Sequence, residues 1–112
     1  MANRKEKVEH SILEVAGRFL NEHSNRQSLI TASRVLLSSD MSKATVFFTV
    51  YPRNKEKAVF DFLMRKRTDF RSFLKEEMYL KRLPFVDFQI DNAEKKRQDF
   101  DELVLKLKNE EK

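Results

Sequence analysis

Glycine is nearly absent from this chain of 112 residues, and its absence limits the backbone conformations open to the protein. The single glycine, Gly17, lies among residues with a helical pattern. Walker loops, dinucleotide-binding fingerprints and nucleophile elbows all need glycine where the backbone approaches a ligand or takes a positive φ. The sequence therefore argues against a nucleotide-dependent enzyme.

A chain of this length can hold one domain with a single modest core. Its composition, 40% hydrophobic and 37% charged, is typical of a soluble globular protein. No apolar run exceeds four residues, which argues against a membrane span and a signal-peptide core. Without cysteine, the chain has no disulfides, thiolate metal sites or cysteine nucleophiles. We expect a cytoplasmic monomer that carries no cofactor.

The first half of the sequence predicts a helix followed by a β-hairpin. Apolar residues recur at helical spacing over residues 4–24, and residues 29–37 are rich in β-branched and aliphatic side chains. A polar turn over residues 38–42 leads into a second strand with strict alternation. We expect one set of its side chains to face the core: Ala44, Val46, Phe48 and Val50. The other set faces the opposite side: Thr45, Phe47, Thr49 and Tyr51.

The second half predicts a bent helix and a third strand. Pro52 ends the second strand, and Asn54 is placed to cap a helix over residues 55–78. A straight helix of that length would span roughly 36 Å, which is long for so small a domain. We expect a bend within residues 65–69, where the apolar pattern lapses and Thr68 or Asp69 can cap a second helix. Residues 85–90 then alternate as a strand.

These elements predict an α+β fold with a three-stranded sheet and its helices on one face. A crossover through the bent helix should place the third strand parallel to the second, which would then be central. The core prediction adds Val8, Ile12, Phe19, Val59, Leu63, Phe70 and Leu74 from the helices. We expect a domain over residues 1–91 and a charged tail over residues 92–112. The tail can form a short helix through Phe100, Leu103, Val104 and Leu107.

No arrangement of residues in the sequence predicts catalysis or metal binding, so we expect a protein that is not an enzyme. His10 and His23 are thirteen residues apart without further ligands nearby, and we expect both at the surface. The acidic pairs at 76–77 and 110–111 are adjacent, so their carboxylates diverge on a helix. The serines of the turn lack a neighbouring base.

Charge distribution is more informative than any single residue. Residues 53–82 contain ten basic and five acidic side chains, a net +5 that equals the formal charge of the whole chain. The residues before this segment contribute +2 and those after it −2. The bent helix is therefore basic, which indicates a nucleic-acid surface. On the second strand, Phe47 and Tyr51 either stack on bases or pack against the tail.

Basic side chains cluster where the bend is expected. Arg71 and Lys75 follow the run of residues 65–67 by one and two helical turns, which would project charge along one exposed side. The candidate contact residues are Arg65, Lys66, Arg67, Arg71 and Lys75, with Lys81 and Arg82 as flankers. Two alternatives stay open: a solvated helix face without a partner, and a basic face that binds an acidic protein.

Five short stretches form a pattern that points to a known family. They are residues 3–8 (NRKEKV), 38–46 (SSDMSKATV), 70–74 (FRSFL), 80–84 (LKRLP) and 101–103 (DEL). In these stretches the chain resembles the bacterial ribosome-binding factor A family, whose hairpin reads Ser-Pro-Asp-Leu-Ser-x-Ala-x-Val. The resemblance covers nearly the whole sequence.

The resemblance implies a type II KH-like domain with the order α-β-β-α-α-β. It also implies that the partner is the small ribosomal subunit with its rRNA, whose late maturation the family assists. The family joins its two middle helices through an Ala-x-Gly kink. The matching positions here read Lys66-Arg67-Thr68, which lack glycine and add two positive charges that favour RNA contact.

Overall fold

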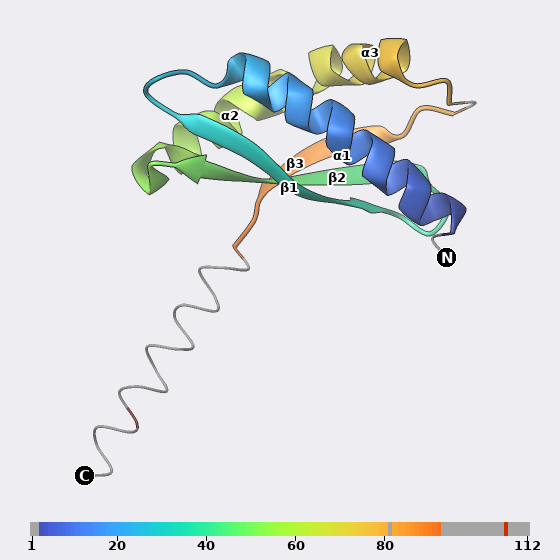
Figure 1. The fold of residues 1–112 in the computed structure, drawn as a ribbon, viewed down its shortest axis with the longest axis horizontal. Coiled ribbons are helices and arrows are strands. Elements are labelled where there is room, and N and C mark those ends of the chain that lie inside the picture. Colours follow the sequence, from blue (N-terminus) through green and yellow to red (C-terminus); the bar gives the residue numbers. More distant parts are fainter. Residues whose placement is uncertain (1–2, 81, 93–106, 108–112) are drawn as a thin grey trace.

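The protein folds as an α+β domain in a computed structural model that describes residues 3–80, 82–92 and 107 (Figure 1). Its elements are α1 (Arg4–His23), β1 (Leu29–Leu37), β2 (Lys43–Tyr51), a 3₁₀ turn η1 (Arg53–Lys55), α2 (Glu56–Arg65), α3 (Arg67–Glu77) and β3 (Phe85–Ile90). This order confirms the α-β-β-α-α-β arrangement expected of a KH-like fold.

The three strands form one sheet in the order β1-β2-β3. β2 is central: it pairs antiparallel with β1 and parallel with β3. All three helices lie on one face of the sheet, with α1 over β1 and with α2 and α3 over β3 (Figure 1). The sheet topology and the one-sided helical layer confirm the sequence prediction.

The core lies between this helical layer and the sheet. Alternate residues of β2, from Ala44 to Val50, are buried as predicted, and Phe48 is completely inaccessible to solvent. The rings of Phe48 and Phe70 both meet Phe88 edge-on, at centroid distances of 6.3 and 5.4 Å. Such edge-to-face contacts add to the stabilisation from burial. The strand faces are therefore assigned correctly, while Val8 lies partly buried at the margin of the core.

The hairpin turn is built from side-chain hydrogen bonds instead of glycine. Met41 takes a left-handed φ of 61°, a conformation that costs about 1–2 kcal/mol for a residue with a Cβ. The Ser38 hydroxyl accepts from the Lys43 amide at 3.0 Å, and the Asp40 carboxylate accepts from the Ser42 amide and hydroxyl. Hydrogen bonds from Ser38 and then Ser42 lower the pKa of Asp40 from 3.8 to about 2.

The helix bend falls at a single residue, Lys66. Its φ of −97° and ψ of 8° lie in the bridge region at negative φ, which does not require glycine. The prediction that Thr68 or Asp69 caps the second helix is wrong. The Phe70 amide donates to the Lys66 carbonyl at 2.9 Å, which starts α3 at Arg67 and places both residues inside its first turn.

Asn54 does not cap α2, contrary to the prediction. It lies within η1, where the Lys55 amide donates to the Pro52 carbonyl at 3.0 Å. This tight turn leads directly into α2, whose first residue follows Lys55 without a side-chain cap. The predicted tail helix lies outside the described residues except for Leu107, which is helical and half exposed. No helix in the described part of the chain combines the length and apolar character needed to cross a membrane.

Candidate functional site

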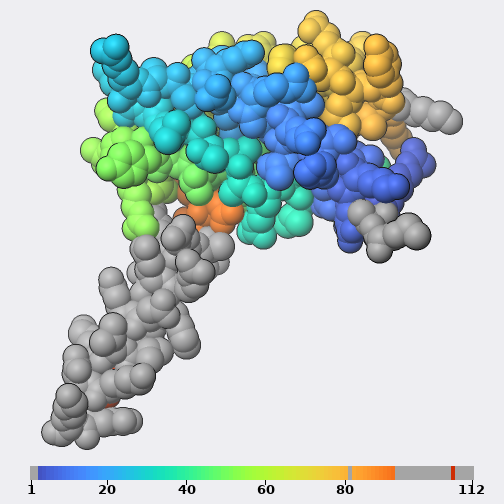
Figure 2. All heavy atoms as spheres, in the orientation of Figure 1, coloured from blue at the N-terminus to red at the C-terminus, as the bar shows by residue number. Residues whose placement is uncertain are grey.

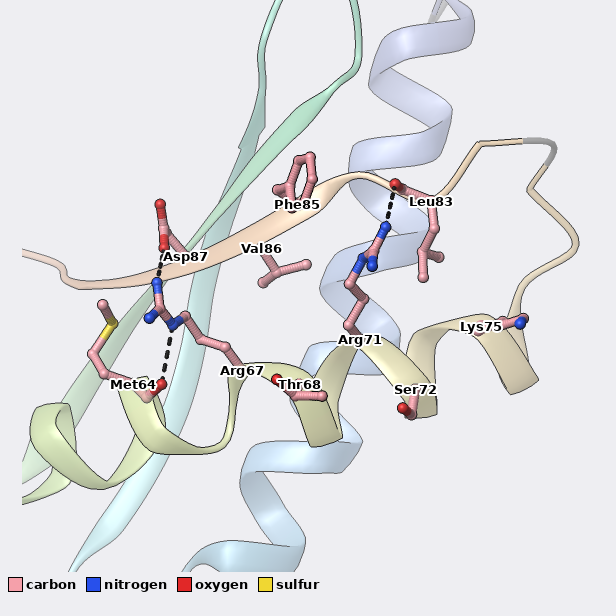
Figure 3. Close-up of a pocket in the computed structure, with 10 residues that line it drawn as sticks. All are labelled: Met64, Arg67, Thr68, Arg71, Ser72, Lys75, Leu83, Phe85, Val86 and Asp87. Carbon is pink, nitrogen blue, oxygen red and sulfur yellow. Dashed lines mark hydrogen bonds and ion pairs between the residues drawn. The ribbon is translucent and has the colours of Figure 1, made fainter.

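A hollow of about 600 Å³ lies between α3 and β3 (Figure 3). Basic side chains four residues apart line its helical side, and β3 forms the opposite side. We call this hollow the basic groove and define it by Arg67, Arg71 and Lys75 of α3 with Phe85, Val86 and Asp87 of β3. Four residues of α-helix advance about 6 Å, so the three cations form a row along the groove.

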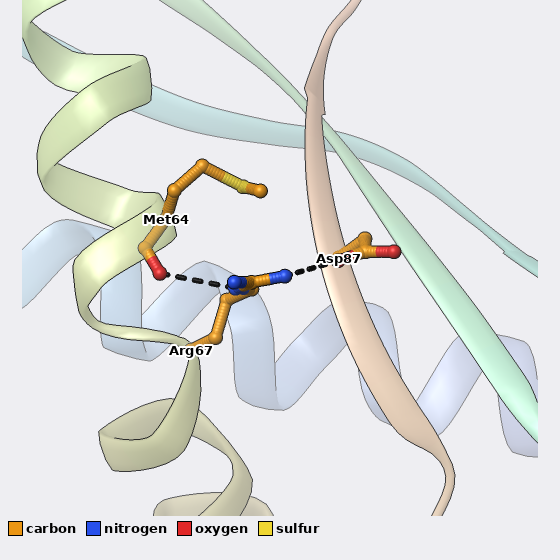
Figure 4. Close-up of polar contacts among 3 residues, drawn as sticks. All are labelled: Met64, Arg67 and Asp87. Atoms are coloured by element: carbon orange, nitrogen blue, oxygen red, sulfur yellow. Dashed lines mark hydrogen bonds and ion pairs between the residues drawn. The ribbon is translucent and has the colours of Figure 1, made fainter.

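Arg67 stands at the start of α3 and points towards β3 (Figure 4). Its Nη1 donates to Asp87 Oδ1 at 2.8 Å, and its Nε donates to the Met64 carbonyl at 3.0 Å. Both side chains of the ion pair are accessible to water, with 46% of the Arg67 side chain and 61% of the Asp87 side chain exposed. The guanidinium is therefore oriented by the protein while remaining accessible to a ligand.

Arg71 holds the segment before β3 against α3. Its Nη2 donates to the Leu83 carbonyl at 3.2 Å, and its Nε donates to the Pro84 carbonyl at 3.3 Å. The guanidinium carbon lies 5.0 Å from the centre of the Phe85 ring, within range of a cation–π interaction. Arg71 is partly buried. It therefore contributes positive charge to the groove but also shapes it.

The structure gathers three of the predicted contact residues and separates the rest. Lys75 is exposed in the groove and makes no ion pair with any described residue. Arg65 and Arg82 are exposed outside the groove. Lys66 is partly buried, 3.4 Å from Asp69 and above the Phe62 ring. Lys81 lies outside the described residues. The cations thus do not share one helix side, because the bend at Lys66 divides them between α2 and α3.

Two groove residues were missed by reasoning from the sequence. Asp87 brings a carboxylate into the basic row, and Phe85 exposes 67% of its surface beside Arg71. The alternation of the third strand carried a signal for both, since it places residues 85, 87 and 89 on the face away from the core. What the pattern could not show is that this strand ends up beside the basic helix.

The aromatic and histidine candidates from the sequence lie outside the basic groove. Phe47 is covered by Arg34, whose guanidinium carbon lies 4.0 Å from the ring centre, while Tyr51 is 75% exposed. His10 pairs with Glu14 at 3.2 Å, and His23 packs edge-on against Phe19. Within the described ranges, no three histidine or acidic side chains gather as metal ligands would.

Comparison with known proteins extends over almost the whole chain. A profile of the family described as ribosome-binding factor A matches residues 4–104. The chain is 29% identical over 115 residues to the ribosome-binding factor A of Lactobacillus helveticus, an alignment that covers 99% of this chain and 95% of the relative. The match therefore includes the helices, the sheet and part of the tail.

Solved structures share the fold. The crystal structure of ribosome-binding factor A from Thermus thermophilus has a TM-score of 0.71 at 21% identity and covers 80% of this chain and 97% of its own. A Thermotoga maritima protein solved by NMR has a TM-score of 0.70 at 26% identity, with 83% and 92% covered. A homology model of the Thermus thermophilus factor, fitted into the cryo-EM map of a 30S complex with that factor, has a TM-score of 0.64 at 20% identity, with 83% and 97% covered.

Proposed function

The chain belongs to the ribosome-binding factor A family, and from that premise we propose that it binds the small ribosomal subunit through rRNA and assists its late maturation. The proposal is supported by the related Thermus thermophilus factor, which was fitted into a map of a 30S complex. The protein would act in the cytoplasm by binding alone, without a chemical step.

The basic groove is the observation that carries this proposal. It presents three cations in a row against one carboxylate, and that carboxylate is already paired with Arg67. Each phosphate that a cation neutralises releases condensed counterions, which favours binding and makes it weaken with salt. Double-stranded rRNA would be bound through its backbone and shape, because side chains cannot read the deep groove of an A-form duplex.

We assign different roles to the basic residues. Arg67 and Lys75 would contact phosphates directly, because both side chains are exposed in the groove. Arg71 would mainly hold the groove open at the segment before β3 while adding to its positive potential. The flanking contacts would come from Arg65, Lys66, Lys81 and Arg82. Residues 1–91 would form the ribosome-binding domain, with residues 92–112 as an appended tail.

Cosedimentation with purified small subunits tests the function. The wild type should sediment with the subunits, and the double variant Arg67→Gln, Lys75→Gln should bind more weakly and with a shallower salt dependence. The matched control is Lys55→Gln, Lys57→Gln, which removes the same charge from exposed positions outside the groove. An equal loss in both variants would show that general charge, not the groove, drives binding.

A pull-down from cell extract addresses the remaining alternative of an acidic protein partner. Small-subunit rRNA should be recovered with the protein and lost after nuclease treatment. Two results together would contradict the proposed function and favour the alternative. They are no recovery of rRNA from the untreated extract, and a protein partner that stays bound after nuclease treatment.

A further inference from the structure

A second hollow, of about 450 Å³, lies between α1, from Arg4 to Arg18, and the end of α3 with the connection that follows it. We call it the α1 hollow and define it by Arg4, Lys7 and Ser11 of α1 with Tyr79 and Leu80 of the connection. Figure 2 shows α1 and α3 side by side on this face of the molecule. None of these residues lines the basic groove.

The α1 hollow carries uncompensated positive charge. Its lining holds three cations, Arg4, Lys7 and Arg18, against two carboxylates, Glu14 and Glu77. Glu77 pairs with Arg18 at 3.1 Å, and Glu14 lies 3.2 Å from His10, which is charged only when protonated. Arg4 and Lys7 are exposed and form no ion pair with the described residues. The charge that a ligand would meet in this hollow is therefore positive.

These two cations do not serve the stability of α1. Positive charge in the first turns of a helix opposes the helix dipole and is unfavourable. The start of α1 is already capped, because the Asn3 side chain accepts from the Glu6 amide at 2.8 Å. The positions of Arg4 and Lys7 are better explained by an anionic partner than by helix formation.

Tyr79 adds a flat aromatic surface to the same hollow. It is fully exposed, the most exposed large hydrophobic side chain among the described residues. An aromatic ring that the described residues leave uncovered offers a face on which a base can stack, and stacking accepts any base. Unpaired bases in RNA are commonly held this way, on an aromatic side chain with cations at the backbone.

We propose that the α1 hollow binds an unpaired nucleotide of the RNA, with the base stacked on Tyr79 and the adjoining phosphates on Arg4 and Lys7. This inference rests on the proposed function and adds a second contact to it. The basic groove engages duplex backbone, and the α1 hollow engages a single-stranded nucleotide. The protein thereby recognises a junction between paired and unpaired RNA.

Intrinsic fluorescence tests the stacking contact directly. The chain has two tyrosines and no tryptophan, so a Tyr51→Phe protein reports on Tyr79 alone. A single-stranded oligouridine of about eight nucleotides should quench this emission at saturation, and a duplex of equal length should not. Unchanged emission on binding of the single strand would overturn the inference.

The affinity of matched variants for the oligouridine tests the same contact. Tyr79→Ala should weaken binding of the oligouridine about ten-fold, and Tyr79→Phe should retain it because phenylalanine also stacks. The control Leu36→Ala removes an exposed apolar side chain from β1 and should leave affinity unchanged. An equal loss from the two alanine variants, or a Tyr79→Phe protein as weak as Tyr79→Ala, would contradict a stacking role.

The salt dependence of binding tests the phosphate contacts. Arg4→Gln, Lys7→Gln should make the salt dependence of single-strand binding shallower by about 1.4 in the slope of log K against log salt. The melting temperature should not fall, because both cations oppose the helix dipole. Lys55→Gln, Lys57→Gln is again the charge control, and a slope change of equal size there would overturn the assignment.

Cosedimentation with small subunits distinguishes a failure of the α1 hollow proposal from a failure of the proposed function. A wild type that sediments with small subunits but shows no response at Tyr79 would overturn the α1 hollow and leave the proposed function standing. A wild type that fails to sediment would overturn the proposed function, while quenching of Tyr79 by single-stranded RNA would still support the hollow as a nucleotide site.

Discussion

Arg67 and Asp87 are twenty residues apart in the sequence, and their side chains meet at 2.8 Å across the basic groove. The pair joins the first residue of α3, which directly follows the bend at Lys66, to the middle of β3. Because both side chains are about half exposed, the pair contributes little to stability. Its main consequence is to direct the Arg67 guanidinium into the groove.

The first prediction is that Asp87→Asn tightens RNA binding. The change removes the only carboxylate among the described residues that line the groove, and it releases Arg67 to a phosphate. We expect about a five-fold gain in affinity, the size of one ion-pair interaction in water, with a change in unfolding free energy below about 1 kcal/mol. Filter binding and urea denaturation provide the measurements. Asp61→Asn, the same change on the exposed side of α2, should produce no such gain.

The second prediction is that Arg71 contributes more to stability than Arg67. Arg71→Gln should lower the unfolding free energy by about 1–3 kcal/mol, because the partly buried carbonyls of Leu83 and Pro84 lose a charged donor. Arg67→Gln should cost less than about 1 kcal/mol, as expected for an exposed pair. Urea unfolding of the two variants compares them. Equal losses would show that Arg71 does not hold the segment before β3.

The third prediction concerns the core. Phe48→Ala should destabilise the domain by about 3–5 kcal/mol, because the ring is fully buried and its loss leaves a cavity beside Phe88. Phe85→Ala removes a ring that is 67% exposed and should cost less than about 1 kcal/mol. Chemical denaturation measures both, and a loss below 1 kcal/mol at Phe48 would mean that this side chain does not anchor the core.

The fourth prediction uses the pKa of Asp40, which hydrogen bonds from Ser38 and Ser42 lower to about 2. A carboxyl with a depressed pKa in the folded state stabilises the fold above its unfolded value of 3.8, and that contribution is lost as the pH falls towards 2. NMR titration should show the pKa of Asp40 moving back towards 3.8 in Ser38→Ala. A pKa still near 2 in that variant would exclude the Ser38 hydroxyl as the main cause.

The order and faces of the elements follow from local patterns in the sequence. The alternation of residues 44–51 assigned the buried face of β2 correctly, because side chains of a strand must point to opposite sides. The spacing of Val59, Leu63, Phe70 and Leu74 identified the buried side of the bent helix, because residues three or four apart lie on one face of a helix. Parallel pairing of β2 and β3 followed from the helical crossover that connects them.

The basic groove was predicted only in part. Charge counting located the basic segment, and Arg67, Arg71 and Lys75 do line one hollow. The bend was placed in the correct stretch, but the sequence favoured capping residues where the structure uses Lys66. A side-chain cap contributes only about 1 kcal/mol, and the backbone angles of Lys66, at negative φ, do not require a glycine.

Only the tertiary structure decided what each basic side chain does. All three groove cations are long basic side chains of α3, yet their contacts differ. Arg67 pairs with a carboxylate, Arg71 donates to two backbone carbonyls, and Lys75 is exposed without an ion pair to any described residue. Their partners lie on β3 and on the segment before it, at positions 83–87. Local sequence determines helix, strand and buried face because those depend on near neighbours. The role of each cation depends on the packing of α3 against β3, which brings distant residues together.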